Sequence, residues 1–422
     1  MIRENRPGMR ASPPLPPARA KTRCDALGVA PFSDRAGSLF RPWLGPAHRA
    51  TLEQVAVWMR EAGMTVAVDQ AANIVGHYPG LTRDAPVLLL GSHLDSVENA
   101  GRYDGALGVM LGIEAVAHFH AAGRRFPFAI DVIGFGDEEG SRFPTYMIGS
   151  RAVAGCLLPV DPSLRDAAGV TLAEALAEWG QTIETLPLAR RGRIAAYVEA
   201  HIEQAPHLER AGQALGVVRG IASQLRYRVR VTGQAAHAGT AMGERQDALA
   251  ASAEGILAIE RIGASGPPDL VTTVGVLTVA GGAPNVVAGD AVFSLDIRAL
   301  DPTIRDGAAR EIVEALDGVA VRRGVTVTFE REQDLSGARC DAALAAALAE
   351  AAERVTGQIP PSLVSQAGHD AMVMAHAAPM VMLFIRCAGG ISHNPAESVA
   401  PEDVDAARDT LIGFIERFGV PA

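Results

Sequence analysis

The sequence is poor in cysteine, has no long apolar run and carries fewer basic than acidic side chains, and each shortage excludes something. Four cysteines in 422 residues, with no C-x-x-C pair, argue against a thiolate zinc site and favour reduced thiols in a cytoplasmic protein. No apolar stretch approaches the ~18 residues that span a bilayer, so no membrane partner is expected. The net charge of −10 argues against a nucleic-acid partner, although a few arginines would suffice for a local anion pocket.

The N-terminal stretch also lacks the apolar core of a secretory signal. It combines arginines with two proline pairs, Pro13-Pro14 and Pro16-Pro17, and offers little apolar surface to bury. We predict that residues 1–22 are disordered or follow a misassigned start, and that the folded chain begins at residue 23.

What remains is enough chain for a large core and more than one domain. Apolar runs and helical stripes alternate along the first half, which is typical of a βαβ sheet with helices on both faces. The expected strands are 87–90, 129–135 and one ending at 197–201, and the expected helices are 48–62 and 105–122.

The pattern changes near residue 218. Residues 225–231 alternate apolar and polar side chains, as in a sheet with one solvated face. The other elements expected in this part are strands at 271–279, 291–297 and 325–329 and helices near 244–263 and 302–317. The chain then returns to its earlier style, with elements expected at 344–355, 380–385 and 401–418.

These changes predict an α/β protein with a second domain inserted into the first. The expected parts are an α/β domain formed by residues 23–217 and 334–422, and a small α+β domain at 218–333.

Side chains of the types that can bind metals follow the predicted buried strands. His93 and Asp95 come after the run at 87–90, and Glu138 and Glu139 come after the next strand. Open α/β sheets build their sites at the carboxyl ends of strands. Imidazole and carboxylate without thiolate suit a catalytic divalent metal, with one neighbouring carboxylate free to handle protons. Three further candidate ligands come from strand ends or loops: Asp104, His201 and His393. The pattern predicts a metal-dependent hydrolase.

Other interpretations of these residues are weaker. Asp104 taken alone is also a good N-cap for the helix that follows it. Gly134, Gly136 and Gly140 approach a dinucleotide-binding loop, but the third glycine falls one residue late and three acidic residues would face the pyrophosphate. The G-x-S-x-G motif of a serine nucleophile is not present.

Several motifs in order along residues 24–420 carry a family resemblance. They are Gly91-Ser-His-Leu-Asp-Ser96, Gly101-Arg-Tyr-Asp-Gly-Ala-Leu-Gly108, Asp137-Glu-Glu-Gly-Ser-Arg-Phe143, Glu199-Ala-His-Ile-Glu-Gln204, Gln234-Ala-Ala-His-Ala-Gly-Thr240, Leu295-Asp-Ile-Arg298, Ala367-Gly-His-Asp-Ala371 and Gly390-Ile-Ser-His-Asn-Pro395. With these motifs the chain resembles the binuclear-metal amidohydrolases of the hydantoinase/carbamoylase branch, in the aminoacylase/carboxypeptidase clan. The resemblance implies a mixed-sheet, metallopeptidase-like catalytic domain with an inserted lid and dimerisation domain.

The resemblance also implies two divalent ions per subunit, zinc or manganese, with cobalt or nickel as alternatives. Such a pair, about 3.5–4 Å apart, holds a water and lowers its pKa. The implied metal ligands are His93, Asp104 (shared by both ions), Glu139, His201 and His393. Glu138 is implied as the general base, with Asp95 orienting His93 and His369 buttressing the site.

In the inserted domain the resemblance implies substrate contacts and a homodimer. His237 matches a residue that polarises the substrate carbonyl from the partner subunit, and Arg298 suits a bidentate grip on a carboxylate. Asn285 is implied to bind substrate with them, and Gln204, beside His201 in the first domain, is expected to line the pocket.

The implied reaction removes a ureido group from a small carboxylate and releases ammonia and carbon dioxide. Residues 96–104 and 123–130 look closest to bacterial allantoate amidohydrolases, so allantoate is the expected substrate. The alternatives are an N-carbamoyl-L-amino acid amidohydrolase or β-ureidopropionase and, least favoured, a non-catalytic binding protein on the same scaffold. The departures from the family pattern are Ala205, Ala288, Gln366 and a short loop after Thr240. They fall in the pocket and lid, away from the ligands, and leave the substrate open.

Overall fold

The computed structural model describes residues 16–419, which form two compact units. The first unit runs to Arg219 and continues with Cys340–Leu363 and from His369 onward. The second unit consists of Gly220–Arg339 together with the short segment Val364–Gly368. The inserted part therefore ends later than the expected residue 333.

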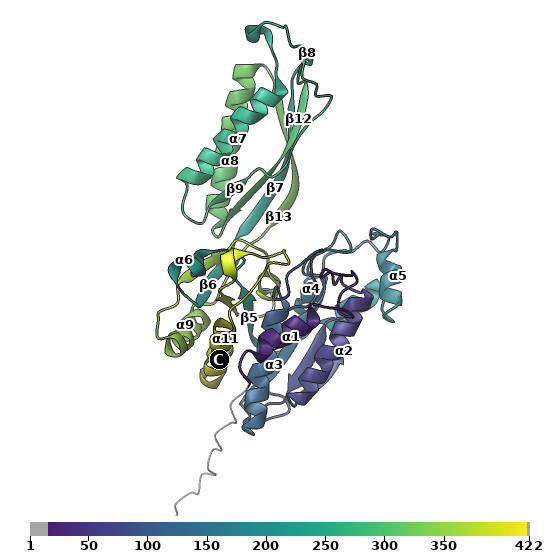
Figure 1. Cartoon of the computed structure of the whole chain (residues 1–422), viewed down its shortest axis with the longest axis vertical. Coiled ribbons are helices and arrows are strands. Elements are labelled where there is room, and N and C mark those ends of the chain that lie inside the picture. Colours follow the sequence, from purple (N-terminus) through teal and green to yellow (C-terminus); the bar gives the residue numbers. More distant parts are fainter. Residues whose placement is uncertain (1–15, 420–422) are drawn as a thin grey trace, which may run out of the picture. The chain divides into compact units, whose positions relative to one another are not determined.

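A nine-stranded mixed sheet organises the first unit (Figure 1). Its order is β1-β2-β4-β3-β5-β16-β6-β14, with β15 also paired to β6. The strands are β1 (Thr65–Val68), β2 (Ile74–Tyr78), β3 (Val87–His93), β4 (Ala129–Phe135), β5 (Ile194–Ile202), β6 (Leu215–Ile221), β14 (Ala338–Arg339), β15 (Ser362–Ser365) and β16 (Met380–Ile385). The central strands β4, β3, β5 and β16 are parallel. They are buried on both faces, which explains their unbroken apolar runs.

Helices cover the sheet and complete the core. They are α1 (Arg19–Leu27), α2 (Pro46–Glu61), α3 (Ala106–Ala121), α4 (Ile148–Ala154), α5 (Leu172–Ala177), α6 (His207–Ala211), α9 (Ala342–Thr356), α10 (Asp370–Met374) and α11 (Pro401–Arg417), with short 3-10 turns η1 (Ile183–Ala189) and η3 (Ala388–Gly390). The main core packs α1, α2, α3, α9 and α11 against apolar side chains of the central strands. In the described part of the chain, no helix is both long and apolar enough to cross a membrane.

The second unit is an antiparallel sheet covered by two helices. Its elements are β7 (Ser223–Thr232), β8 (Ala236–His237), β9 (Val271–Thr273), β10 (Leu277–Val279), β11 (Val286–Val287), β12 (Asp290–Ala299), β13 (Thr326–Leu335), α7 (Ala248–Ser265), α8 (Pro302–Arg323) and the turn η2 (Met242–Glu244). Along β12 every second residue is buried, and these residues pack against α7 and α8. Asp247 and Asp301 cap the two helices by accepting backbone N–H groups.

Two expectations differ from the structure. Residues 271–279 are not one strand: β9 and β10 are separate, because the backbone N–H groups of Gly275 and Val276 donate to the Ser294 hydroxyl instead of to a neighbouring strand. The disorder expected for residues 1–22 falls mostly outside the described residues, but its last part is helical. Helix α1 begins at Arg19, whose guanidinium donates to the buried carboxylate of Glu114 in α3 at 2.6–2.8 Å.

Candidate metal centre and active site

The parallel strands bring three candidate groups to one edge of the sheet. Strand β3 is parallel to both β4 and β5, and its last residue, His93, pairs with Phe135 at the end of β4. Glu138 and Glu139 follow in the turn after β4, and His201 lies near the end of β5. Parallel strands end on the same side, so the sequence order already dictates that these side chains meet.

Asp104 reaches the same place from the loop that precedes α3. The Asp104 carbonyl accepts the Ala106 N–H at 2.7 Å, and Gly105 between them has φ 65° and ψ −57°. This tight γ-turn is strained for any residue with a side chain. A Cβ on Gly105 would also lie only 2.4 Å from the His93 ring. Glycine at this position therefore lets Asp104 approach the strand ends.

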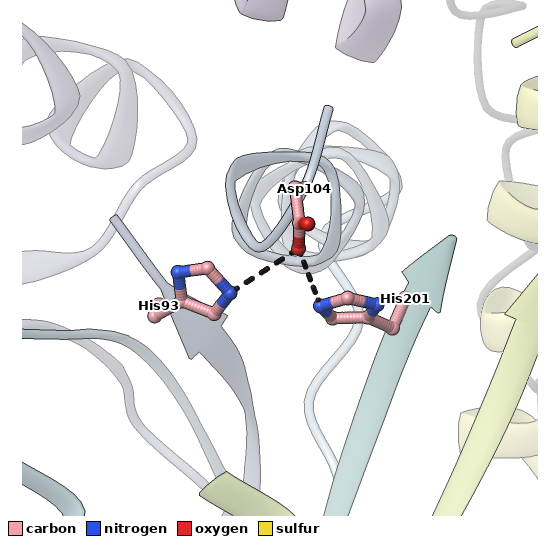
Figure 2. A group of neighbouring side chains, drawn as sticks. All are labelled: His93, Asp104 and His201. Atoms are coloured by element: carbon pink, nitrogen blue, oxygen red, sulfur yellow. Dashed lines mark ion pairs between the residues drawn. The ribbon is translucent and has the colours of Figure 1, made fainter. Parts of the chain in front are cut away.

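His93 and His201 direct their Nε2 atoms at the same oxygen, Asp104 Oδ1, over 3.5 Å and 3.0 Å (Figure 2). Their Nδ1 atoms lie 3.0 Å and 2.8 Å from the backbone carbonyls of Asp95 and Ile202. A carbonyl can only accept, so each Nδ1 carries a proton, and each ring in its neutral form presents a lone pair at Nε2. Lone pairs that face a carboxylate oxygen repel it unless a cation lies between them.

The pKa shifts of these groups also indicate that positive charge is favoured between the imidazoles and the Asp104 carboxylate. Burial alone would lower the pKa of His93 and His201, but the Asp104 carboxylate outweighs it and raises both. Burial would raise the pKa of Asp104, yet the three imidazoles, with His393 as the third, hold it well below its usual range. Protons on the imidazoles or a metal ion would each satisfy the site.

A second group forms around the other oxygen of Asp104. His393 Nε2 lies 3.3 Å from Asp104 Oδ2 and 3.4 Å from Glu139 Oε1. Burial, followed by the negative charge of Asp104, raises the pKa of Glu139 to about 7. The His393 backbone has φ 53°, a conformation that residues other than glycine rarely adopt and that is enriched at functional sites.

The donor atoms are close enough to share metal ions. Within each group the ligand atoms lie within 4.8 Å of one another, and the groups are His93–Asp104–His201, Asp104–Glu139–His393, His93–Glu138–Glu139 and Glu199–His201–His369. Histidine and carboxylate donors of this kind suit zinc, manganese and related divalent ions. The residues therefore fit the metal that the sequence predicts, and all predicted ligands come together.

Asp95 acts differently from the expectation. Its carboxylate lies 3.8 Å from His93 Nδ1, and the backbone carbonyl of Asp95 takes the ring N–H instead. The carboxylate oxygens accept the backbone N–H groups of Glu138 and Glu139, each at 3.2 Å. Asp95 thus holds the turn that carries the paired glutamates. Burial, together with the charges of neighbouring carboxylates such as Glu139, raises the pKa of Glu138 well above its usual value.

His369 and Gln204 also contact the centre. The buried His369 ring lies edge-on to His201 with centroids 4.5 Å apart, and burial followed by the His201 charge lowers its pKa. Gln204 donates from Nε2 to Asp104 Oδ2 at 2.9 Å, with a backbone φ of 57°. Gln204 therefore braces a candidate ligand directly.

Two buried glutamates were missed by the sequence analysis. Glu199 accepts the hydroxyls of Ser92 and Tyr197 and the backbone N–H of Ala371 at 2.8–3.0 Å. It lies two residues before His201 on β5, so strand periodicity places both on one face and could have revealed it. Glu397 lies in an irregular loop, and no sequence pattern singles it out.

In the second unit Arg298 is already engaged. Its Nε and Nη2 donate to the two oxygens of Asp296 at 2.7 Å and 3.2 Å, and Nη1 donates to the Gln366 carbonyl. Arg226 donates to the same Asp296 carboxylate at 3.1 Å. Arg298 and Asp296 thus form an ion pair within β12.

His237 and Asn285 lie side by side but far from Arg298. The Ala238 N–H donates to the Asn285 carbonyl at 2.9 Å, which joins the two loops. Arg298 pairs with Gln224 near one end of the β7–β12 strand pair, where β9 joins the sheet. Strand β8, which contains His237, lies beyond the other end of this pair (Figure 1). The eight residue-to-residue steps from Asp290 to Arg298 span about 26 Å. One copy of the unit does not bring Asn285 and Arg298 together.

Comparison with known proteins assigns the chain to a family. Residues 89–417 match peptidase family M20/M25/M40. Allantoate deiminase 1 of Glycine max is 37% identical over 91% of this chain and 86% of its own length. N-carbamoyl-L-amino acid amidohydrolase of Geobacillus stearothermophilus is 42% identical over 86% of this chain and 89% of its own length. A hydantoinase/carbamoylase family amidase from Burkholderia multivorans superposes with a TM-score of 0.86 and 32% identity, covering 94% of this chain and 95% of that one.

The chain belongs to peptidase family M20/M25/M40. The predicted α/β fold and the predicted resemblance to the hydantoinase/carbamoylase branch are confirmed. The protein is a metal-dependent hydrolase of C–N bonds, as the sequence predicted.

Replacing Gly105 tests how tightly the Asp104 loop is built. Gly105→Ala should destabilise the protein by about 2–4 kcal/mol, because it combines backbone strain with a clash against His93. Gly212→Ala is the matched control, since Gly212 has φ 64° but nothing within 4 Å of a Cβ. It should cost about 1 kcal/mol. Urea denaturation measures both, and equal costs would show that the close approach to His93 is unimportant.

Proposed function

We propose that the protein hydrolyses the ureido group of a small carboxylate, most suitably allantoate, and releases ammonia and carbon dioxide. The observation that carries this proposal is the pair of donor groups that share Asp104, with the carboxylate of Glu138 next to them. Relatives named as allantoate deiminase and N-carbamoyl-L-amino acid amidohydrolase support the substrate class. The second name keeps N-carbamoyl-L-amino acids as the alternative substrate.

Two divalent ions would fit the centre. His93, Asp104 and His201 would hold one, and Asp104, Glu139 and His393 the other, so that the shared Asp104 lies between them. When bound, such ions supply Lewis acidity, which lowers the pKa of water and stabilises negative charge on a substrate oxygen. Zinc and manganese are the first candidates, with cobalt and nickel next, because imidazole and carboxylate ligands accept all four.

Glu138 is the proposed general base. Its Oε2 lies 4.0 Å from His93 Nε2, and Asp95 fixes its backbone beside the cluster. Glu138 takes the proton from the attacking water and returns it to the leaving nitrogen. Glu139, held by the same carboxylate of Asp95, faces His393 instead, so the two adjacent glutamates have different neighbours and divide the roles of base and ligand.

Arg298 is the proposed partner of the substrate carboxylate. Arg298 and Arg226 carry two positive charges against the single negative charge of Asp296, which leaves one positive charge for an anion. Of the five N–H groups of a guanidinium, three bond Asp296 and Gln366, and two are left for substrate. Asp296 holds the planar group in place, as a bidentate clamp requires.

His237 is the proposed donor to the substrate carbonyl. The Gly239 N–H donates to its Nδ1 at 3.0 Å, so the neutral ring carries its proton on Nε2, which is exposed. Because His237 and Arg298 lie at opposite ends of the β7–β12 pair, two copies of the unit would be needed to supply both to one substrate. This separation supports the homodimer, in which His237 serves the partner's site.

Ammonia release over a panel of substrates tests the reaction. Metal-free protein should be inactive and should regain activity with Mn²⁺, Zn²⁺, Co²⁺ or Ni²⁺ on allantoate or on N-carbamoyl-L-amino acids. Glu138→Gln keeps the shape of the side chain but not its basicity, so it should bind the same metal and lose about 10²–10⁴-fold in kcat. A fully active metal-free enzyme, or an active Glu138→Gln variant, would refute the proposal.

Arg298→Lys tests the carboxylate clamp. Lysine keeps the charge but loses the planar fork, so KM for allantoate and N-carbamoyl amino acids should rise by about tenfold or more. Arg228→Lys is the control, because Arg228 is exposed on β7 and pairs with Glu332. Unchanged kinetics in Arg298→Lys would remove the clamp from the proposal.

Hybrid dimers test the shared site. Co-expressed His237→Ala and Glu138→Gln chains, each inactive alone, should recover roughly a quarter of wild-type activity, because half of randomly paired dimers are hybrid and each has one intact site. Purification through two different tags isolates the hybrids. Inactive hybrids, or fully active monomers in sedimentation, would contradict the proposal that the two subunits share each active site.

A further inference from the structure

Glu397 connects the two loops that carry Asp104 and His393. Its Oε1 accepts the backbone N–H groups of Tyr103 at 2.7 Å and Asp104 at 3.1 Å. The Ser392 hydroxyl lies 2.5 Å from Asp104 Oδ2 and 3.2 Å from Glu397 Oε2, so the two carboxylates share its one proton. The side chain is 5% exposed, although its loop is irregular. Two backbone N–H groups and the shared Ser392 hydroxyl together hold the buried Glu397 carboxylate in one orientation.

The opposing loop is shaped to admit this carboxylate. A Cβ on Gly101 would lie 2.1 Å from Glu397 Cδ and 2.3 Å from Oε1, far inside van der Waals contact. The backbone of Gly101 has ordinary φ, so the absence of a side chain here serves the close approach of Glu397 and no turn. Gly101 and Glu397 therefore form one contact across 296 residues of chain.

His93 and His201 lie on strands of the central sheet, whereas Asp104 and His393 lie on loops. Strands are held by their ladders, but loops need another support to keep two donors at a metal-binding spacing.

We propose that Glu397 is a positioning residue that sets the spacing of Asp104 and His393 and thereby the metal affinity of the centre. This inference rests on the proposed metal centre. Glu397 acts through the main chain of Asp104 and through Ser392, the neighbour of His393. Removing the carboxylate releases both loops and lets Asp104 and His393 move apart.

Titration of metal-free protein with Co²⁺, followed by calorimetry and by the visible spectrum of the ion, tests the inference without any activity assay. Glu397→Ala should weaken Co²⁺ binding about 10–100-fold and alter the spectrum, as the loss of an outer contact to metal ligands does. Gly101→Ala should act in the same direction because it expels the carboxylate. Glu397→Gln should show a smaller loss, since its amide oxygen still accepts the two backbone N–H groups.

Glu402→Gln is the control, because it also removes one negative charge. Glu402 lies five residues after Glu397, at an exposed position in the first turn of α11. It should bind Co²⁺ like wild type. Wild-type affinity and spectrum in folded Glu397→Ala and Gly101→Ala would overturn the inference. If Glu397→Ala does not fold, Gly101→Ala and Glu397→Gln decide by the same criteria. Wild-type protein that binds no Co²⁺ would instead refute the metal centre itself, so the two failures are distinguishable.

Discussion

The burial of the Asp104 carboxylate between imidazole lone pairs is the constraint around which the first unit is arranged. Lone pairs and like charges repel strongly away from water, and the surrounding carboxylates of Glu138, Glu139 and Glu199 add to this repulsion. Protons on the imidazoles or bound metal ions would each offset this repulsion. The fold supplies the rigidity that this requires, through parallel strands on one side and braced loops on the other.

Local strain marks the same place. Asp137, Gln204 and His393 all have positive φ without being glycine, and each adjoins a residue of the candidate centre or belongs to it. Each such conformation costs of order 1–3 kcal/mol and persists only where packing and hydrogen bonds enforce it. Here the enforcing contacts are visible, because Gln204 is bonded to Asp104 and the Asp137 carbonyl accepts the Met147 N–H. The large core of the first unit outweighs these costs.

The second unit separates its two sets of polar groups along one pair of strands. His237 and Asn285 lie beyond one end of β7 and β12, and the Arg298–Asp296–Arg226 cluster lies near the other. An antiparallel sheet covered by helices is well suited to hold two such groups at a constant separation. The separation is a property of a single chain, and it is the observation on which the proposed homodimer rests.

The sequence alone determined the parts of the protein that depend on periodicity and on chain order. The apolar runs at residues 87–90 and 129–135 dictate buried parallel strands, and parallel strands dictate that His93, Glu138 and His201 meet at one edge. The motifs indicated the family and the remaining candidate ligands. Only the tertiary structure decided which groups support them. The carbonyl of Asp95 holds His93, Glu397 bridges two loops far apart in the chain, and Asn285 and Arg298 stay separate. These contacts join irregular segments, whose approach depends on how the whole chain packs and leaves no periodic trace in the sequence.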